Sequence, residues 1–239
     1  ILSWRGPNHP NAGGAEISTH EHAKGWVRAG HEVTLFTSAF AGCREEVEKD
    51  GVRIIRRGRQ ILRVQWEAFK WYLFGKHPNF DLVIDQFHGV PFFTPIYVKA
   101  KKIGFIHEVS KEVWKLNPWP WPFNQIVGFF GKTFEPLLFK LLYRRIPFMT
   151  VSESTKNDLI EWGVPPALIT VIHNGINVPK LTRLHSKEKK KAVLYLGAIS
   201  KDKGIEDALK VFQIIDRVEK DRWQFWIVGK ADQSYLERL

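Results

Sequence analysis

The chain alternates short β-branched and aliphatic runs with longer segments of helical periodicity, and this alternation is the strongest constraint on its fold. Strands separated by helices predict a parallel sheet that helices cover on both faces. We therefore predict an α/β protein with a doubly wound, Rossmann-like sheet. The expected strands are residues 1–3, 31–37, 51–56, 81–85, 104–107, 148–151 and 168–173, and the expected helices are 15–29, 61–75, 124–143 with an interruption near Pro136, and 152–162.

A polar and basic stretch without apolar periodicity divides the chain at residues 179–191. We predict a first domain at 1–179, a linker at 180–191, and the beginning of a second Rossmann-like domain at 192–239. The second domain is expected to be incomplete, because a single strand–helix–strand unit of roughly 50 residues buries little core. Its expected elements are the strands 193–196 and 224–228 and the helix 204–218.

Composition excludes several classes of protein. The 239 residues are 44% apolar and 26% charged, which is typical of a folded chain rather than a disordered one. There is no run of eighteen apolar residues, so we expect no membrane span. A single cysteine, Cys43, cannot form an internal disulfide and suits a reducing compartment, so we expect a cytoplasmic protein.

The net charge of +11 indicates an anionic partner. Phosphate-bearing ligands, anionic membranes and nucleic acid would each suit it. The basic residues form no stripe interleaved with aromatic residues, apart from 187–191, which we interpret as part of a solvated linker. We therefore expect no nucleic-acid partner.

The first candidate site is the segment Asn11–Glu16, between the first strand and the first helix. Gly13 and Gly14 would let an anion approach the backbone N–H groups at the positive end of the helix. The alternative is a tight strand-to-helix turn without a ligand. The G-x-G-x-x-G spacing is absent, which disfavours a nicotinamide or flavin enzyme.

Two further candidates lie at the ends of expected strands and helices. His107 and Glu108 follow a strand, where side chains face the ligand-binding edge of a doubly wound sheet. Lys203 and Gly204 precede the helix of the second unit, after Gly197, and a lysine there could neutralise a diphosphate. A structural histidine and an ordinary surface lysine are the alternatives.

These motifs occur in a familiar order, which is Asn11–Glu16, Val151–Ser154, Val171–Asn177, Leu196–Gly197 and Lys203–Gly204. Together they resemble glycosyltransferase family 4, retaining sugar transferases of the GT-B fold. The resemblance extends over essentially the whole chain. It implies a nucleotide-sugar donor bound mainly by the second domain, and a glycan or lipid-linked acceptor bound mainly by the first.

The resemblance also implies roles for individual residues. His107 would lie beside the reacting sugar, and Lys203 would stabilise the leaving diphosphate. The donor would contact Gly13, Gly14, Gly197, Lys203 and Gly204, and the acceptor side would include Asn11, Glu108, Ser152 and Asn174. Such transferases need no bound metal for this task, and we expect neither a metal nor a cofactor.

The chain departs from the family pattern in two respects. Ala198 follows Gly197 where the family usually has an arginine, so half of the expected diphosphate clamp is missing unless Arg5 or Lys201 replaces it. The family also has two glutamates further downstream, and this chain ends before that point. We therefore expect an incomplete donor site. The alternative function is a non-catalytic acceptor-binding fragment or split subunit that needs a separate donor-binding partner.

The segment Trp114–Tyr143 is rich in aromatic and aliphatic residues, with Lys132, Lys140, Arg144 and Arg145 among or beside them. Tryptophan next to basic residues suits a membrane interface. The alternative is a helix packed against the sheet. We retain peripheral membrane contact as a hypothesis because it would fit a lipid-linked acceptor.

Overall fold

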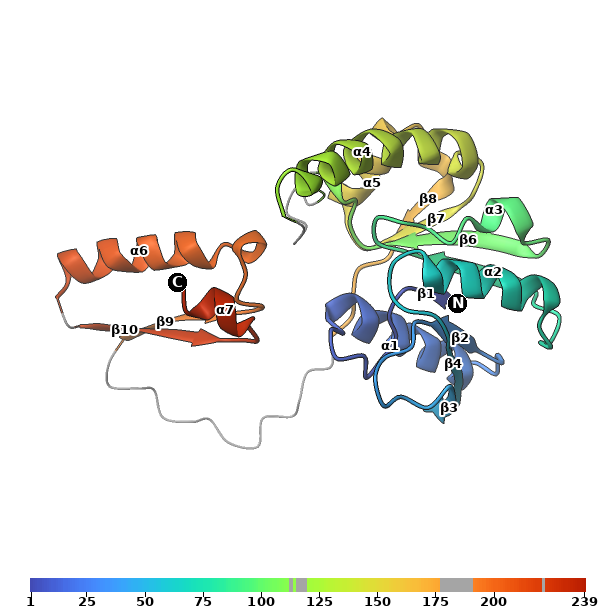
Figure 1. Cartoon of the computed structure of the whole chain (residues 1–239), viewed down its shortest axis with the longest axis horizontal. Helices are drawn as coiled ribbons and strands as arrows, with labels where there is room; N and C mark the ends of the chain where they lie inside the picture. The colour runs from blue at the N-terminus through green and yellow to red at the C-terminus, as the bar shows by residue number, and fades with distance from the viewer. Residues whose placement is uncertain (112–113, 115–119, 177–190, 221) are drawn as a thin grey trace. The chain divides into compact units, whose positions relative to one another are not determined.

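The computed structural model describes residues 1–111, 114, 120–176, 191–220 and 222–239 (Figure 1). The chain divides into two compact units, Ile1–Ile176 and Asn177–Leu239. The predicted linker at 180–191 lies outside the described residues except for Lys191, which is the first residue of a strand. Each unit is described here by itself.

The first unit is built on one eight-stranded sheet with the order β3-β4-β2-β1-β5-β6-β7-β8. Every neighbouring pair is parallel except β3 and β4. This confirms the predicted doubly wound α/β sheet. The strands are β1 Leu2–Ser3, β2 Thr34–Thr37, β3 Glu46–Lys49, β4 Val52–Arg56, β5 Leu82–Gln86, β6 Lys101–Ile106, β7 Phe148–Thr150 and β8 Ile169–Val171.

Helices cover both faces of this sheet because alternate strand residues are buried on opposite sides. In β2, Leu35 packs in a cluster with Ala23, whereas Phe36 packs against Trp71 with ring centroids 5.1 Å apart. Figure 1 shows the helices α4 (Phe123–Leu138) and α5 (Glu153–Glu161) grouped with β7 and β8, and it shows β3 at the opposite edge of the sheet. The helices are α1 Gly14–Arg28, α2 Arg63–Phe74, α3 Thr94–Tyr97, α4 Phe123–Leu138 with the π-helical segment η2 Phe139–Tyr143, and α5 Glu153–Glu161 with the 3-10 turn η3 Pro166–Leu168.

Strand β3 was absent from the sequence prediction. It pairs with β4 in antiparallel register, and the two strands are joined through Asp50 and Gly51, both at positive φ (53° and 76°). Asp-Gly between strands is a strong hairpin signal. The charged residues of β3 hide its strand character, because an edge strand needs few apolar side chains.

The interruption predicted near Pro136 takes the form of a change from α-helix to π-helix just beyond this proline. Helix α4 continues through Pro136 to Leu138 and then becomes η2. Proline removes one backbone hydrogen bond, but tertiary contacts hold the helix beside it. The neighbouring Glu135 is buried, and it accepts hydrogen bonds from Trp114 Nε1 (2.6 Å) and the Ser110 N–H group (3.4 Å).

The second unit contains one parallel strand pair, β9 Lys191–Leu196 with β10 Trp223–Val228, joined through α6 Ile205–Val218. This is the predicted strand–helix–strand pattern. The 3-10 turn η4 Lys201–Lys203 precedes α6, and α7 Gln233–Leu236 follows β10. Among the described residues of the chain, no helix is long and apolar enough to cross a membrane.

A fully buried carboxyl group, that of Asp85, ties the middle of the sheet to its helices. It accepts hydrogen bonds from the Tyr143 hydroxyl (2.6 Å), the Thr94 hydroxyl (2.7 Å) and the Phe92 N–H group (3.1 Å). Burial raises the pKa of Asp85, while the donors from Tyr143 and Thr94 act in the opposite direction. These bonds connect β5 to α3 and η2.

We expect Tyr143→Phe to lower the free energy of unfolding by about 1–3 kcal/mol, because Asp85 then loses a donor in a buried site. Urea denaturation followed by circular dichroism would measure the change. Tyr72→Phe is the matched control, since the Tyr72 hydroxyl makes no hydrogen bond to the part of the chain that the structure describes. An equal effect of both substitutions would contradict the role given to Asp85.

The carboxyl group of Glu135 makes stability depend on pH. Burial raises its pKa from 4.5 to about 7, while the hydrogen bonds from Trp114 and Ser110 act in the opposite direction. The folded chain therefore retains a proton that the unfolded chain releases near pH 4.5. Stability contributed by this group is lost as the pH rises from about 4.5 to 7.

We expect Glu135→Gln to remove this loss, because the amide has no charge to bury and still offers an acceptor to Trp114. Relative to the parent chain, the variant should gain more stability at pH 8 than at pH 5. The gains at the two pH values should differ by at most about 3 kcal/mol, since each tenfold change in proton affinity corresponds to about 1.4 kcal/mol. Urea midpoints at the two pH values measure it, and equal gains at both would contradict the prediction.

Candidate functional site

The carboxyl ends of the parallel strands place the candidate site where the strand order reverses. Strand β1 lies between β2 and β5, so the chain proceeds outward from β1 in both directions. In doubly wound sheets ligands bind outside the strand ends at such a point. The segments leaving β1 and β5 therefore lie at the expected ligand-binding edge.

The segment after β1 is held in place by the buried carboxylate of Glu16, in the first turn of α1. Glu16 Oε2 accepts the Gly13 N–H group at 2.6 Å, and Glu16 Oε1 accepts Arg5 Nε at 3.0 Å. An acidic residue in this turn also suits the helix dipole. Because the Gly13 N–H group is bonded to Glu16, the outward-facing donors at this helix end are those of Gly14 and Ala15.

The space in front of these donors is open. A β-carbon added to Gly14 would meet no protein atom within 4 Å, and one on Gly13 would meet only Glu16 Oε2, at 3.6 Å. Gly13 is extended (φ −126°), so positive φ does not explain the glycine. Glycine is an ordinary N-cap residue, but a helix with glycine in its first turn is less stable than one with alanine there. Neither packing nor backbone geometry requires Gly14, whereas close approach of a ligand would.

Two side chains beside this segment, Trp4 and His88, were absent from the predicted site, and Arg5 was predicted only as a possible replacement in the diphosphate clamp. The Arg5 guanidinium lies over the Trp4 ring, 4.1 Å from its centroid, and the Trp4 ring stacks on His88 at 5.6 Å. His88 follows β5, so this stack joins the two segments at the reversal point. The signal that could have identified them was the strand order, because residues just after β1 and β5 are neighbours only in that order.

His107 directly follows β6, as predicted. Its ring lies 4.6 Å from that of Phe105, and its carbonyl accepts the Thr155 hydroxyl at 3.0 Å. Burial lowers the pKa of His107, and the Glu16 carboxylate acts in the opposite direction. Nε2 is buried and has no hydrogen-bond partner among the described residues. Burial therefore favours the neutral form of this imidazole, and its Nε2 is enclosed without a partner in the described part of the chain.

Two other predicted residues converge on the same end of the sheet. Ser152 is the N-cap of α5, and its Oγ accepts the N–H group of Thr155, the residue that also bonds His107. Asn174, beyond β8, accepts the Ser18 hydroxyl of α1 through Oδ1 at 2.6 Å. Residues separated by more than a hundred positions in the sequence are thereby joined at one edge.

The last two acceptor-side candidates are exposed. Asn11 lies in the segment before α1, where its N–H group donates to His9 Nδ1 at 3.1 Å. Glu108 follows His107, and its carboxylate is 3.8 Å from His88 Nδ1. Both residues lie on the same segments as Gly13 and His107, but neither side chain has two buried hydrogen bonds as Glu16 does.

In the second unit, Gly197, Lys203 and Gly204 belong to the connection between β9 and α6. The Tyr195 hydroxyl ties this connection together by donating to the carbonyls of Ala198 (2.7 Å) and Lys203 (3.3 Å). Gly204 is the N-cap of α6 at φ 72°, a conformation that favours glycine. The Lys203 side chain is 55% exposed and lies 3.8 Å from Asp202, so its ammonium group is accessible.

The described part of the chain contains no group of three or more His, Cys, Asp or Glu side chains that could hold a metal ion. The candidate residues of the first unit offer hydrogen-bond donors, a helix N-terminus and the charge of Arg5, and those of the second unit offer the charge of Lys203.

We expect Glu16→Ala to destabilise the first unit by about 2 kcal/mol or more, because it removes the acceptor for both Gly13 and Arg5 in a buried position. Chemical denaturation would measure this. Glu21→Ala on the same helix is the matched control, because its exposed ion pair with Lys24 contributes about 0.5 kcal/mol or less. Equal losses in the two variants would refute the proposed anchoring by Glu16.

Comparison with known proteins gives matches to two protein families. Residues 12–180 match the family model described as Glycosyltransferase Family 4, and residues 180–239 match the one described as Glycosyl transferases group 1. A search of curated proteins found no match. Together the matches cover both units and agree with the sheet order and the predicted motifs. The chain therefore belongs to glycosyltransferase family 4, with a Rossmann-like first domain of the GT-B fold and domains of a sugar transferase.

Proposed function

We propose that this chain transfers a hexose from a nucleotide diphosphate sugar to a glycan or lipid-linked acceptor, with retention of the anomeric configuration. The observation that carries the proposal is the open N-terminus of α1 at Gly14 beside the neutral His107, in a chain of this transferase family. Retention and the hexose are proposed from the family resemblance of the motifs. The single cysteine supports a cytoplasmic location.

His107 would orient the reacting sugar by hydrogen bonding. Burial lowers its pKa, so its ring is uncharged at neutral pH, and Nε2 has no partner among the described residues. An uncharged ring nitrogen can bond a sugar hydroxyl without placing a cation beside it. The hydrogen bond that the Thr155 hydroxyl donates to the His107 carbonyl holds His107 in position.

Lys203 would stabilise the departing nucleotide diphosphate. Negative charge develops on the leaving oxygen during transfer, and an accessible ammonium group next to a helix N-terminus is suited to neutralise it. Gly197 and Gly204 would let the phosphates approach the backbone. We propose that this electrostatic stabilisation takes the place of a bound metal ion.

The first test is a panel of nucleotide sugars, each assayed for binding and hydrolysis. We expect one donor to bind, and we expect Lys203→Ala to reduce turnover about 10²–10³-fold, the usual effect of removing a group that stabilises developing charge. His107→Ala should reduce it about 10²-fold or more. Lys210→Ala on α6 and the exposed His31→Ala are matched controls that should leave turnover unchanged.

The outcomes separate the candidate functions. If no nucleotide sugar binds, or if both active-site variants retain full transfer, the proposed mechanism is wrong. Binding of an acceptor glycan without any donor binding would favour the non-catalytic acceptor-binding subunit. Binding of a nicotinamide cofactor would favour an oxidoreductase instead.

A further inference from the structure

Helix α4 and η2 carry an apolar face that is turned away from the sheet. Their buried face is formed by Gly128, Glu135, Phe139 and Tyr143. Six residues spaced three or four apart form the opposite face, which we call the α4 stripe, and each is 46–67% exposed: Phe123, Ile126, Phe130, Phe134, Leu137 and Leu141. The stripe is about 27 Å long, taking 1.5 Å per residue. A contiguous apolar surface of this kind marks an interaction site.

The charges beside the stripe have one sign. Over residues 120–147 the basic residues are all exposed, and the one acidic residue, Glu135, is only 5% exposed. Within the described ranges, Lys140, Arg144 and Arg145 form no ion pair with a carboxylate. The surface that α4 and η2 present is therefore apolar along its middle and cationic along its flanks and its C-terminal end.

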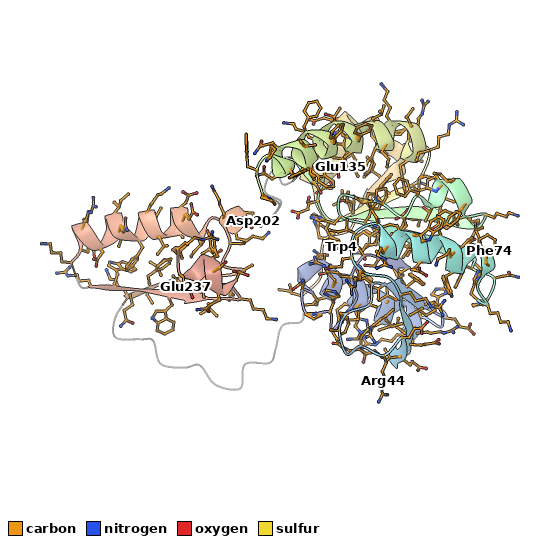
Figure 2. The ribbon with its side chains drawn as sticks, in the orientation of Figure 1. Trp4, Arg44, Phe74, Glu135, Asp202 and Glu237 are labelled. Atoms are coloured by element: carbon orange, nitrogen blue, oxygen red, sulfur yellow. The ribbon has the colours of Figure 1, made fainter. Side chains whose placement is uncertain are left out.

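The glutamate is removed from this surface by its own contacts. Glu135 points toward the protein, where Trp114 and the Ser110 N–H group bind its carboxyl group (Figure 2). Gly131 allows this approach, because a β-carbon there would lie 2.2 Å from the Trp114 ring. Trp121, just before α4, is 80% exposed and adds an amphipathic ring at the N-terminal end of the segment.

These features suit a lipid surface better than a protein partner. The core of a protein interface is depleted of charged residues, and a lysine or arginine buried there needs a paired acid. At a membrane, the aliphatic stems reach outward and the cations meet the phosphates, while a tryptophan lies at headgroup level. The helix is not one that could cross the bilayer, so it would lie in the interface plane.

We propose that the α4 stripe docks in the plane of an anionic membrane, with Lys140, Arg144 and Arg145 on the lipid phosphates. This interaction goes beyond sugar transfer and does not depend on it. It would hold the acceptor-binding unit at the surface where a lipid-linked acceptor is found.

Cosedimentation with vesicles tests the proposal. The 239-residue chain should bind vesicles of phosphatidylcholine and phosphatidylglycerol, and it should bind pure phosphatidylcholine much more weakly. Replacing Phe130 and Phe134 together by serine should weaken binding by roughly 100-fold, about tenfold for each ring withdrawn from the interface. Lys140→Glu, Arg144→Glu and Arg145→Glu combined should weaken binding to the anionic vesicles by about 100-fold or more.

The control is Phe74→Ser, a substitution at the end of α2, where the ring is 79% exposed (Figure 2). It should not change vesicle binding, and circular dichroism should show all variants folded because every altered side chain is exposed. Unchanged binding by both α4 variants would overturn the proposal, as would equal binding of the parent chain to neutral and anionic vesicles. If the parent chain elutes as a dimer in gel filtration and the variant with Phe130→Ser and Phe134→Ser elutes as a monomer, the stripe is a protein interface. None of these assays contains a sugar donor, so failure here leaves the transfer proposal standing.

Discussion

Parallel strand pairing is the constraint on which the first unit depends. Parallel strands cannot be joined by tight turns, so every crossover must travel over a face of the sheet, and both faces acquire helices. The carboxyl ends of all strands except the antiparallel β3 then lie at one edge. The loops that leave β1, β6, β7 and β8 therefore lie at this edge, and they carry Gly14, His107, Ser152 and Asn174.

Three buried carboxyl groups hold this arrangement, and each joins segments that are distant in sequence. Glu16 binds the segment after β1, Asp85 binds α3 and η2 to the central strands, and Glu135 binds α4 to the loop after β6. Each has at least two donors, because a buried acidic group without partners would cost several kcal/mol. Burial raises the pKa of Asp85 and Glu135. These three acidic residues therefore support the fold, and none of them is proposed to contact a substrate.

Some features were predictable because they depend on local residues. The helix of α1, the N-cap at Ser152 and the strand before His107 each follow from periodicity and capping chemistry within a few positions. Other features depended on distant partners. The continuation of α4 through Pro136 required Trp114 and Ser110 to bind Glu135, and the edge strand β3 required β4 as its partner. Neither Pro136 nor the charged residues within Glu46–Lys49 of β3 indicate these distant contacts in their local sequence.

The sequence by itself determined the class of fold, the family and the candidate residues at the ends of strands, because hydrophobic period and short motifs are local properties. The tertiary structure decided which candidates meet and what state they are in. It assigned the Gly13 N–H group to Glu16, left Gly14 facing open space, enclosed the Nε2 atom of His107 and exposed the α4 stripe. Burial and the choice of hydrogen-bond partner depend on the whole packed unit, and for that reason no stretch of the sequence alone could specify them.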